Sequence, residues 1–442
     1  MRMERLGRGG TPAQVLGALG ERARRLGTPP PAALTGAWFG SAAVVAPSLG
    51  AAPVSAQEAF VCPNAQVRAD GPLIGGGWIG YLAYPDTTTS QPSALPAAAG
   101  GWTDTVLRLD HDGCWWYETL TDDTCPDELT LAVLDPAVSV GNTDTVGNTD
   151  TVDDAANPEP HWGIDWSLPD RDAHRHGVEQ CLDAIRAGEV YQACVCTRFT
   201  GDYTGSPLAF FADAITRTCP DRAAYLEGLW GAVASLSPEL FVSRHGHRLA
   251  SSPIKGTLPL NRDPDDLRAS VKDVAENIMI VDLVRNDLGR VAEPGSIAVP
   301  ELLAVRPAPG VWHLVSTVTA TARPGVSVRD LLDATFPPAS VTGCPKTRAR
   351  ELLQQWEPSS RGVYCGTVGM ASPLAGTELN VAIRTVEFGA DGTCALGVGG
   401  GITIDSDPAA EWQECLDKAA STLALSTPRR VEAVARTAAG VP

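Results

Sequence analysis

Two segments of the sequence carry acidic residues three positions apart, in patterns that predict helices. Asp273 and Glu276 share one helix face, and Glu411 and Glu414 share another. Either pair taken alone could equally be a solvated helix surface. Together the four carboxylates would form an all-oxygen site for Mg²⁺, which takes one or two carboxylates and keeps several waters. The remaining two carboxylates would then hold metal-bound waters.

A glycine tract precedes the second acidic segment and follows an apolar run. It consists of Gly399, Gly400 and Gly401. Because glycine has no Cβ, the backbone N–H groups of such a tract can approach an anion closely. A strained turn explains the tract equally well, and it does not match the dinucleotide-binding fingerprint. The sequence contains neither a P-loop nor a G-x-S-x-G element.

Lysine is rare in this chain, which has 34 basic residues. The lysines are Lys255, Lys272, Lys346 and Lys418. An ammonium group can lose its proton and a guanidinium cannot, so a retained lysine indicates chemistry beyond the reach of arginine; chance is the alternative. We expect only a surface role for Lys272. Lys255 stands before Gly256 and Thr257, where it could bind a carboxylate or act as a nucleophile if burial lowers its pKa.

The composition limits the possible partners. The 442 residues are 44% hydrophobic and 19% charged, which is typical of a globular protein. A net charge of −18 disfavours nucleic acids and anionic membrane surfaces, and no run of 18 apolar residues predicts a transmembrane helix. Eleven cysteines without a C-x-x-C pair predict reduced thiols and a cytoplasmic location. We expect His313 in the core, and the pairs His174/His176 and His245/His247 on the surface.

Hydrophobic periodicity and turn residues predict the surrounding elements. Residues 1–30 are expected to be frayed at the start. The expected helices span 171–188, 207–217, 263–289, 346–355 and 408–423. The expected strands span 189–199, 236–243, 248–252, 312–321, 362–370, 379–388 and 393–398. Helices and strands mix without regular β-α-β alternation, which predicts an α+β fold with antiparallel sheets packed together and helices outside.

A repeat of VGNTDT at residues 140–151 predicts a flexible surface loop. It separates a strand-rich region at 1–155 from a second domain at 165–428, which a tail at 429–442 follows.

Several motifs, in order, resemble the chorismate-utilising enzymes: component I of anthranilate and aminodeoxychorismate synthases, and the isochorismate and salicylate synthases. The motifs are SPELF (237–241), PIKGT (253–257), AENIMIVDLVRNDLGRV (275–291), HLVSTV (313–318), VTGCPKTRA (341–349), GVYCGTVG (362–369), AIRT (382–385) and VGGGITIDSDPAAEWQECLDKA (398–419). GGGWIGYLAY at 75–84 also looks like the family's amino-terminal region. The resemblance implies an anthranilate-synthase-component-I-like fold and a chorismate-binding catalytic domain at 165–428.

One position separates the branches of this family. Anthranilate synthases typically read P-I-A-G-T, whereas the aminodeoxychorismate branch carries a lysine, as at Lys255 here. The resemblance therefore implies conversion of chorismate and ammonia to 4-amino-4-deoxychorismate, the precursor of p-aminobenzoate and folate. It implies that Lys255, held neutral by burial, attacks ring carbon 2 while Glu239 protonates the departing hydroxyl. Ammonia then adds at carbon 4 and expels the lysine.

The resemblance also assigns the metal and substrate contacts. Glu276 and Glu414 would bind Mg²⁺, with Asp273 and Glu411 in the outer shell. The residues expected to contact or position the substrate are Gly256, Thr257, His313, Thr342, Tyr364, Arg384, Gly399, Gly400, Gly401 and Lys418. Among these, Lys418 would hold the carboxylate cluster in place.

Three departures from the family pattern bear on local geometry and regulation. Cys194 replaces a polar amide, and the segment 336–340 reads F-P-P-A-S where glycines are usual. The tryptophan-feedback motif is not recognisable, so no inhibition by tryptophan is expected.

The source of ammonia and the alternative functions complete the expectations. No glutaminase nucleophile segment (G-x-C-x-G) occurs, which implies a separate glutamine amidotransferase subunit as the ammonia source. The alternatives are an anthranilate synthase component I, an isochorismate or aminodeoxyisochorismate synthase, and a non-catalytic chorismate-binding subunit.

Overall fold

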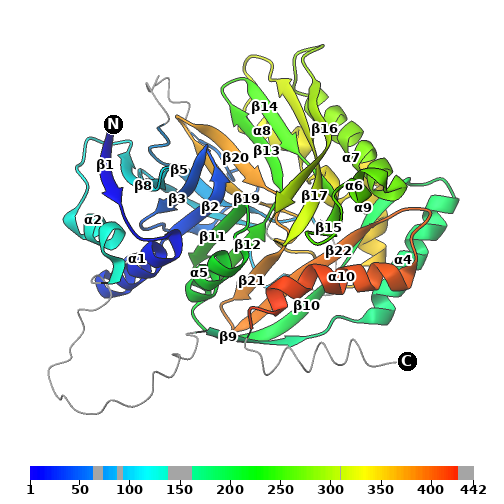
Figure 1. The fold of residues 1–442 in the computed structure, drawn as a ribbon, viewed down its shortest axis with the longest axis horizontal. Coiled ribbons are helices and arrows are strands. Elements are labelled where there is room, and N and C mark those ends of the chain that lie inside the picture. The colour runs from blue at the N-terminus through cyan, green and yellow to red at the C-terminus, as the bar shows by residue number, and fades with distance from the viewer. Residues whose placement is uncertain (63–72, 87–92, 138–161, 309, 427–442) are drawn as a thin grey trace.

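Two antiparallel β-sheets with helices on their outer sides make up the protein (Figure 1). The computed structural model describes residues 1–62, 73–86, 93–137, 162–308 and 310–426. Every strand pair in these ranges is antiparallel. The predicted α+β architecture is therefore confirmed.

The described part of the first sheet has 12 strands. Its order is β1 (Arg2–Arg8), β8 (Cys114–Thr119), β7 (Thr105–Leu109), β3 (Ser41–Ala46), β2 (Ala32–Trp38), β11 (Arg222–Gly228), β12 (Gly231–Ser237), β21 (Thr385–Gly389), β22 (Thr393–Ile402), β10 (Gln192–Gly205) and β18 (Gly343–Cys344), with β9 (Trp162–Ser167) also paired to β10.

The described part of the second sheet has 10 strands. Its order is β15 (Ile254–Pro259), β17 (Val311–Thr321), β14 (Arg248–Ser252), β13 (Leu240–His245), β20 (Gly376–Asn380), β19 (Thr367–Ser372), β5 (Gly77–Leu82), β6 (Ala98–Thr103) and β4 (Ala52–Pro53), with β16 (Ala298–Ala308) also paired to β17. Strand β2 pairs with β11 and β5 pairs with β19, so early and late parts of the chain share both sheets.

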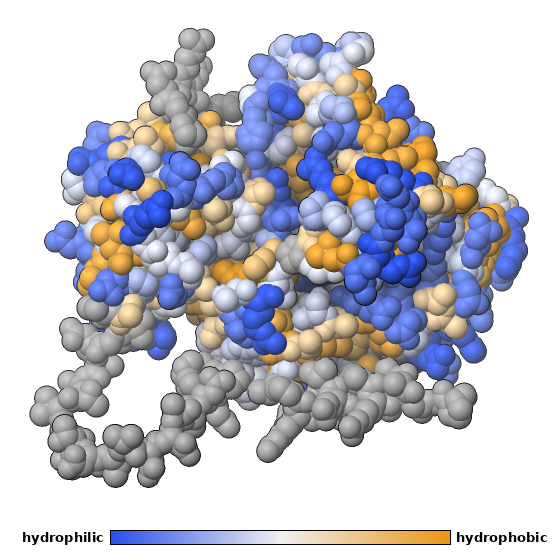
Figure 2. All heavy atoms as spheres, in the orientation of Figure 1, coloured by the Kyte–Doolittle hydropathy of each residue, from blue (hydrophilic) through white to orange (hydrophobic). Residues whose placement is uncertain are grey.

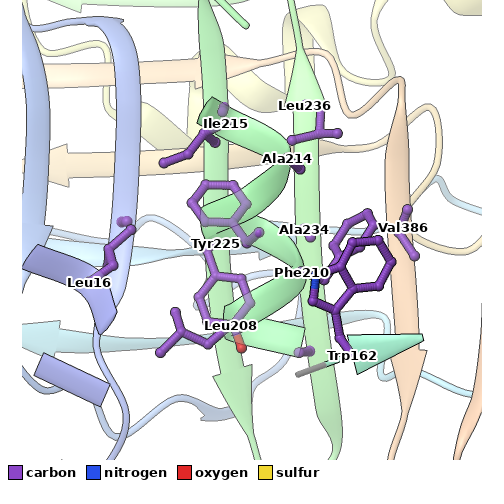
Figure 3. Packing of buried hydrophobic residues seen from close by; sticks show 14 of the residues in the cluster. Leu16, Trp162, Leu208, Phe210, Ala214, Ile215, Tyr225, Ala234, Leu236 and Val386 are labelled. Atoms are coloured by element: carbon purple, nitrogen blue, oxygen red, sulfur yellow. The ribbon is translucent and has the colours of Figure 1, made fainter. Parts of the chain in front are cut away.

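Helices cover the sheets. They are α1 (Pro12–Leu26), α2 (Asp127–Leu134), α4 (Arg171–Arg186), α5 (Pro207–Thr218), α6 (Asp265–Ala269), α7 (Val271–Gly289), α8 (Val328–Thr335), α9 (Lys346–Trp356) and α10 (Pro408–Leu423), with a 3-10 turn at Ala339–Val341. Figure 3 shows α5 against the first sheet, where Leu208 lies beside Tyr225 and Phe210 lies beside Trp162. Helix α10 packs on β22, and α7 packs on β15 and β17 (Figure 1).

The amino-terminal prediction was wrong, because residues 1–30 are ordered by tertiary contacts. Strand β1 pairs with β8, more than 100 residues away in the chain. Helix α1 begins at a capping box in which the Thr11 and Gln14 side chains satisfy each other's backbone N–H groups. Its Leu16 and Leu19 are fully buried in the core.

Three predicted elements are interrupted in the structure. The expected helix at 263–289 is two helices, because Ser270 caps α7 by accepting a hydrogen bond from the Asp273 N–H. The expected strand at 379–388 is β20 and β21 in different sheets, with Arg384 at a left-handed φ of 50° between them. The expected strand at 236–243 likewise divides between β12 and β13 at Pro238 and Glu239.

Other sequence predictions have mixed outcomes. The eleven cysteines form no disulfide, as expected. His174 is only 3% exposed, so its predicted surface location was wrong. No helix in the described ranges is both long and apolar enough to cross a membrane. Hydrophilic and hydrophobic residues are interspersed on the face shown in Figure 2. The VGNTDT repeat and the tail at 429–442 lie outside the described residues.

Candidate active site

The glycine tract lies within a strand, which extends the strand expected at 393–398 to Ile402. Gly399, Gly400 and Gly401 belong to β22 and pair with residues 194–196 of β10. A Cβ on Gly401 would stand 2.0 Å from Oε1 of Glu276, and a Cβ on Gly400 would stand 2.9 Å from Oε2 of Glu411. The glycines therefore make room for the carboxylates of α7 and α10.

A lysine meets each of three predicted metal-site carboxylates. Lys255 Nζ lies 2.7 Å from Glu276 Oε1, and Lys272 Nζ lies 3.1 Å from Glu411 Oε1. Lys418 Nζ lies 2.7 Å from Glu414 Oε1 and donates to the carbonyl of Gly399 at 2.7 Å. Three of the four lysines in the chain therefore belong to one cluster.

Lys272 is the member of this cluster that the sequence did not identify. Lys272 lies at an exposed position of α7, as expected, but its ammonium pairs with Glu411, a residue that is 2% exposed. Ser406 also donates to Oε1 of Glu411, at 2.6 Å. The scarcity of lysine could have identified Lys272 as a site residue. Its position on an exposed helix face pointed instead to a surface residue.

Asp273, the fourth predicted acidic residue, packs from α7 against Gly256, the residue that follows Lys255 in β15. Gly256 adopts a left-handed φ of 88°, and a Cβ there would stand 3.1 Å from the Cβ of Asp273. Glycine at this position therefore allows α7 to approach the strand that carries Lys255.

The charge state of Lys255 differs from the prediction of a neutral amine. Burial works to lower the pKa of Lys255, but the charge and hydrogen bond of Glu276, together with the nearby Cys194, outweigh it and the pKa is raised. Salt bridges likewise raise the pKa values of Lys272 and Lys418 against the effect of burial. The ammonium form of each lysine is therefore the stable one in this arrangement.

The acidic residues fit Mg²⁺ by their chemistry. Oε2 of Glu411 is buried and has no hydrogen-bond partner, so it is free to accept a hydrogen bond from a metal-bound water. Within the described ranges, no three acidic, histidine or cysteine side chains are arranged to hold one ion, since each clustered glutamate turns to a lysine. Mg²⁺ needs only one or two carboxylates, with water and substrate as further ligands.

Glu239 lies between the two sheets, in the connection from β12 to β13. The residue is 3% exposed, and burial raises the pKa of its carboxyl to about 7. A hydrogen bond from Ser340 and the charge of Lys255 oppose this shift. A carboxyl group with this pKa can donate a proton near neutral pH.

His313 and Thr257 face each other across β17 and β15. Oγ1 of Thr257 lies 3.0 Å from Nδ1 of His313, while the buried Nε2 of His313 has no partner. Burial lowers the pKa of His313 to about 4, and the charge of Arg384 acts in the same direction. His313 is therefore a neutral imidazole with one nitrogen available to a ligand.

Arg384 carries a half-buried positive charge beside His313. Burial lowers the pKa of its guanidinium, and no carboxylate in the described ranges forms an ion pair with it. Its left-handed backbone costs on the order of 1–3 kcal/mol in a non-glycine residue. A half-buried guanidinium without a carboxylate partner is suited to an anionic ligand.

Two further predicted residues lie deeper in the protein. The Tyr364 ring packs on β22, where a Cβ on Gly397 would stand 2.1 Å from it, and its hydroxyl is 3.9 Å from Sγ of Cys196. The Thr342 hydroxyl donates to the carbonyl of Pro338. The Thr342 carbonyl accepts from the N–H of Cys194 at 2.8 Å.

Comparison with known proteins gives a consistent family. Residues 41–424 match the family described as chorismate binding enzyme. The aminodeoxychorismate synthase component 1 of Klebsiella aerogenes is 42% identical over 255 residues, which cover 56% of either chain. The aminodeoxychorismate synthase of Streptomyces griseus is 36% identical over 365 residues, which cover 79% of this chain and 50% of that protein. The chain thus spans little more than half the length of these curated relatives.

A solved structure supports the same relationship at the level of the fold. The anthranilate synthase component I from Streptococcus pneumoniae TIGR4 matches with a TM-score of 0.66 at 25% identity, over 81% of this chain and 82% of that one. The expected anthranilate-synthase-component-I-like architecture is therefore confirmed.

Proposed function

The chain belongs to the chorismate binding enzyme family, and from that premise we propose that it replaces the 4-hydroxyl of chorismate with an amino group, forming 4-amino-4-deoxychorismate. The observation that carries the proposal is the position of Lys255. This largely buried lysine pairs with Glu276 of the carboxylate cluster. Its positive charge also acts on the carboxyl group of Glu239. This arrangement supports Lys255 as the nucleophile and Glu239 as the proton donor.

Binding of the substrate would use the charges of the site. Glu276 and Glu414 would hold Mg²⁺, with Asp273 and Glu411 orienting its waters; the ion would supply positive charge for the ring carboxylate. Arg384 would bind the pyruvyl carboxylate, since a guanidinium can form two parallel hydrogen bonds with it.

Positioning of the ring would depend on neutral groups. His313 is neutral, so Nε2 can accept or donate a hydrogen bond according to its tautomer. Thr257 fixes His313 through Nδ1. Tyr364 and Thr342 would close the pocket from the side of β10, while Gly256 lets the strand turn beside Asp273.

The covalent steps would proceed through an adduct with Lys255. Because its ion pair with Glu276 favours the ammonium form, the attacking amine forms only after that pair separates and the proton is lost. The amine then bonds to ring carbon 2, the double bond shifts, and the bond from carbon 4 to oxygen breaks as Glu239 gives its proton. The hydroxyl leaves as water. Ammonia bonds to carbon 4, the double bond shifts back, and Lys255 leaves.

The ammonia would come from a second protein. The Klebsiella aerogenes relative is named component 1, which supports a partner component. We assign that role to a separate glutamine amidotransferase subunit that would hydrolyse glutamine. The unpaired state of all eleven cysteines supports a reducing, cytoplasmic setting for the reaction.

Product analysis tests the proposal. The purified chain is incubated with chorismate, Mg²⁺ and ammonium, and the products are separated with mass detection. We expect a product in which an amine replaces a hydroxyl, and we expect Lys255→Ala to form none. Anthranilate with pyruvate, or an isomer of unchanged mass, would contradict amination at carbon 4. Turnover with glutamine alone would contradict the separate glutaminase.

A further inference from the structure

A small cavity lies beside Glu239 and is distinct from the lysine–carboxylate cluster. Its volume is about 20 Å³, and Glu239, Ser340 and Asp287 line it together with apolar side chains. A polar cavity of roughly 10–15 Å³ or more can hold one water molecule. Glu239 and Asp287 therefore line one cavity that has room for a water.

Asp287 belongs to a buried ion pair at the far side of this cavity. Lys346 donates to Oδ2 of Asp287 and to the carbonyls of Thr335 and Pro337, at 2.8 and 2.9 Å. These three contacts use every hydrogen of the ammonium group. They also hold the segment that leads to Ser340, the hydrogen-bond partner of Glu239.

The proposed reaction requires Glu239 to recover a proton in every turnover. Its proton leaves in the water formed from the 4-hydroxyl, and the residue is only 3% exposed. The side chains of Lys346 and Asp287 are 16% and 10% exposed, so this pair is closer to solvent. Bound substrate would separate Glu239 from solvent on its other side.

We propose that Glu239 is reprotonated through a water in this cavity, with Asp287 and Lys346 as the relay to solvent. The inference rests on the proposed amination of chorismate. The water gives one proton to the Glu239 carboxylate and receives one from the Lys346 ammonium by way of Asp287. The pair recovers its proton from bulk solvent, so the relay is restored after each turnover. Asp287 and Lys346 act through Glu239 and are positioning and relay residues.

The charges around the pair agree with this role. Burial lowers the pKa of Lys346 and raises the pKa of Asp287, which brings both closer to the pKa of Glu239. Arg290 and Arg350 are the other charged groups that act on Lys346. Their positive charge favours release of a proton from the ammonium.

The test compares Asp287→Asn with Asp282→Asn, since Asp282 lies on the same helix in an exposed ion pair with Arg285. For both variants we would measure kcat, the KM for chorismate, the solvent deuterium isotope effect on kcat and the thermal midpoint. We expect Asp287→Asn to lower kcat roughly tenfold, within the range of acid–base contributions. We expect its KM to be unchanged and its isotope effect to increase, because reprotonation becomes rate-limiting. Asp282→Asn should match the parent chain.

A second variant tests the relay even if Asp287→Asn does not fold. Ala339→Val adds volume to the cavity wall without changing a charge, and we expect it to increase the isotope effect in the same way. The relay is excluded if folded Asp287→Asn keeps the kcat and isotope effect of the parent chain, or if kcat falls with an unchanged isotope effect. If the parent chain does not aminate chorismate, the proposed function fails and the relay fails with it. If it does and Asp287→Asn is unaffected, only the relay fails.

Discussion

Lys272 on α7 donates a hydrogen bond of 3.1 Å to Glu411 on α10, and this contact joins the two helices that carry the acidic residues. The two partners differ in exposure, since the Lys272 side chain is 40% exposed and that of Glu411 is 2% exposed. Lys272 is the cation that compensates the buried charge of Glu411 in this arrangement. A divalent cation bound nearby would compete with it for the same carboxylate.

Lys272→Met should therefore lower the stability of the protein in the absence of Mg²⁺. It should also increase the stabilisation that added Mg²⁺ provides. Loss of the compensating cation should cost roughly 1–2 kcal/mol, reduced from the value for a fully buried pair because the lysine is partly exposed. Thermal unfolding with and without Mg²⁺ measures both effects. Arg285→Met, which removes an exposed cation from the same helix, is the control. An equal Mg²⁺-dependent shift in both variants would contradict this role.

Gly401→Ala should disrupt the carboxylate cluster. The added Cβ would stand 2.0 Å from Oε1 of Glu276 and 2.5 Å from Nε2 of Gln192, so Glu276 must move. We expect loss of Mg²⁺ binding by calorimetry together with loss of turnover. Gly17→Ala is the matched control, because a Cβ on this helical glycine meets no atom within 4 Å. Unchanged Mg²⁺ binding in Gly401→Ala would show that Glu276 does not hold the ion.

The pH dependence of kcat should report Glu239. If this group is the proton donor, it must be protonated, so the rate should fall as the pH rises through about 7, the pKa that burial gives it. Glu239→Gln should lower kcat by about 10²–10⁴-fold and remove this limb of the profile. Steady-state rates between pH 5.5 and 9 at saturating ammonia are the measurement. A limb that persists in Glu239→Gln would assign the titration to another group.

Arg384→Met should weaken the binding of chorismate. The variant removes a half-buried guanidinium that has no carboxylate partner in the described ranges, so no ion pair of the described structure is lost with it. A charge-assisted hydrogen bond to an anion contributes about 1.5–3 kcal/mol, or roughly a ten- to hundredfold change in Kd. Calorimetry with chorismate and Mg²⁺ in the absence of ammonia checks this. Arg217→Met, at an exposed pair with Asp213, should bind normally.

Local sequence signals were sufficient where an element is determined by its own residues. Helix α10 spans the predicted 408–423, because Asp407 caps it and Pro408 begins it. The same signals failed at residues 1–30, where pairing of β1 with β8 supplies the order. They also failed at Arg384, since apolar alternation continues across the point where the chain passes from one sheet to the other.

At the candidate site, too, some features could be predicted from the sequence and others could not. Spacing on α7 and α10 identified the carboxylates, and the rarity of lysine drew attention to Lys255. The pairing of Lys418 with Glu414, four residues earlier on α10, was within reach of the sequence. The partner of Lys272 could not be predicted, because Lys272 and Glu411 are 139 positions apart. The raised pKa of Lys255 could not be predicted either, since it depends on whether burial or Glu276 has the larger effect.

His174 makes the stability of the fold sensitive to mild acid. It lies between α4 and α10, with Nε2 3.5 Å from Sγ of Cys415 and a buried Nδ1 without a partner. Burial lowers the pKa of His174 from 6.5 to about 4. Between these values the unfolded chain binds a proton that the folded chain does not, so stability decreases as the pH falls from 6.5 towards 4. At pH 5 the loss from this group is about 2 kcal/mol.

His174→Gln should therefore reduce the difference in unfolding free energy between pH 7 and pH 5 by about 2 kcal/mol, even if the substitution costs stability at both pH values. Urea unfolding at the two pH values provides the measurement. His176→Gln, two residues along the same helix and exposed, should leave the difference unchanged. The buried His313 titrates in the same range and is present in both variants, so its contribution cancels. An unchanged pH dependence in His174→Gln would show that the folded protein accepts a proton at His174.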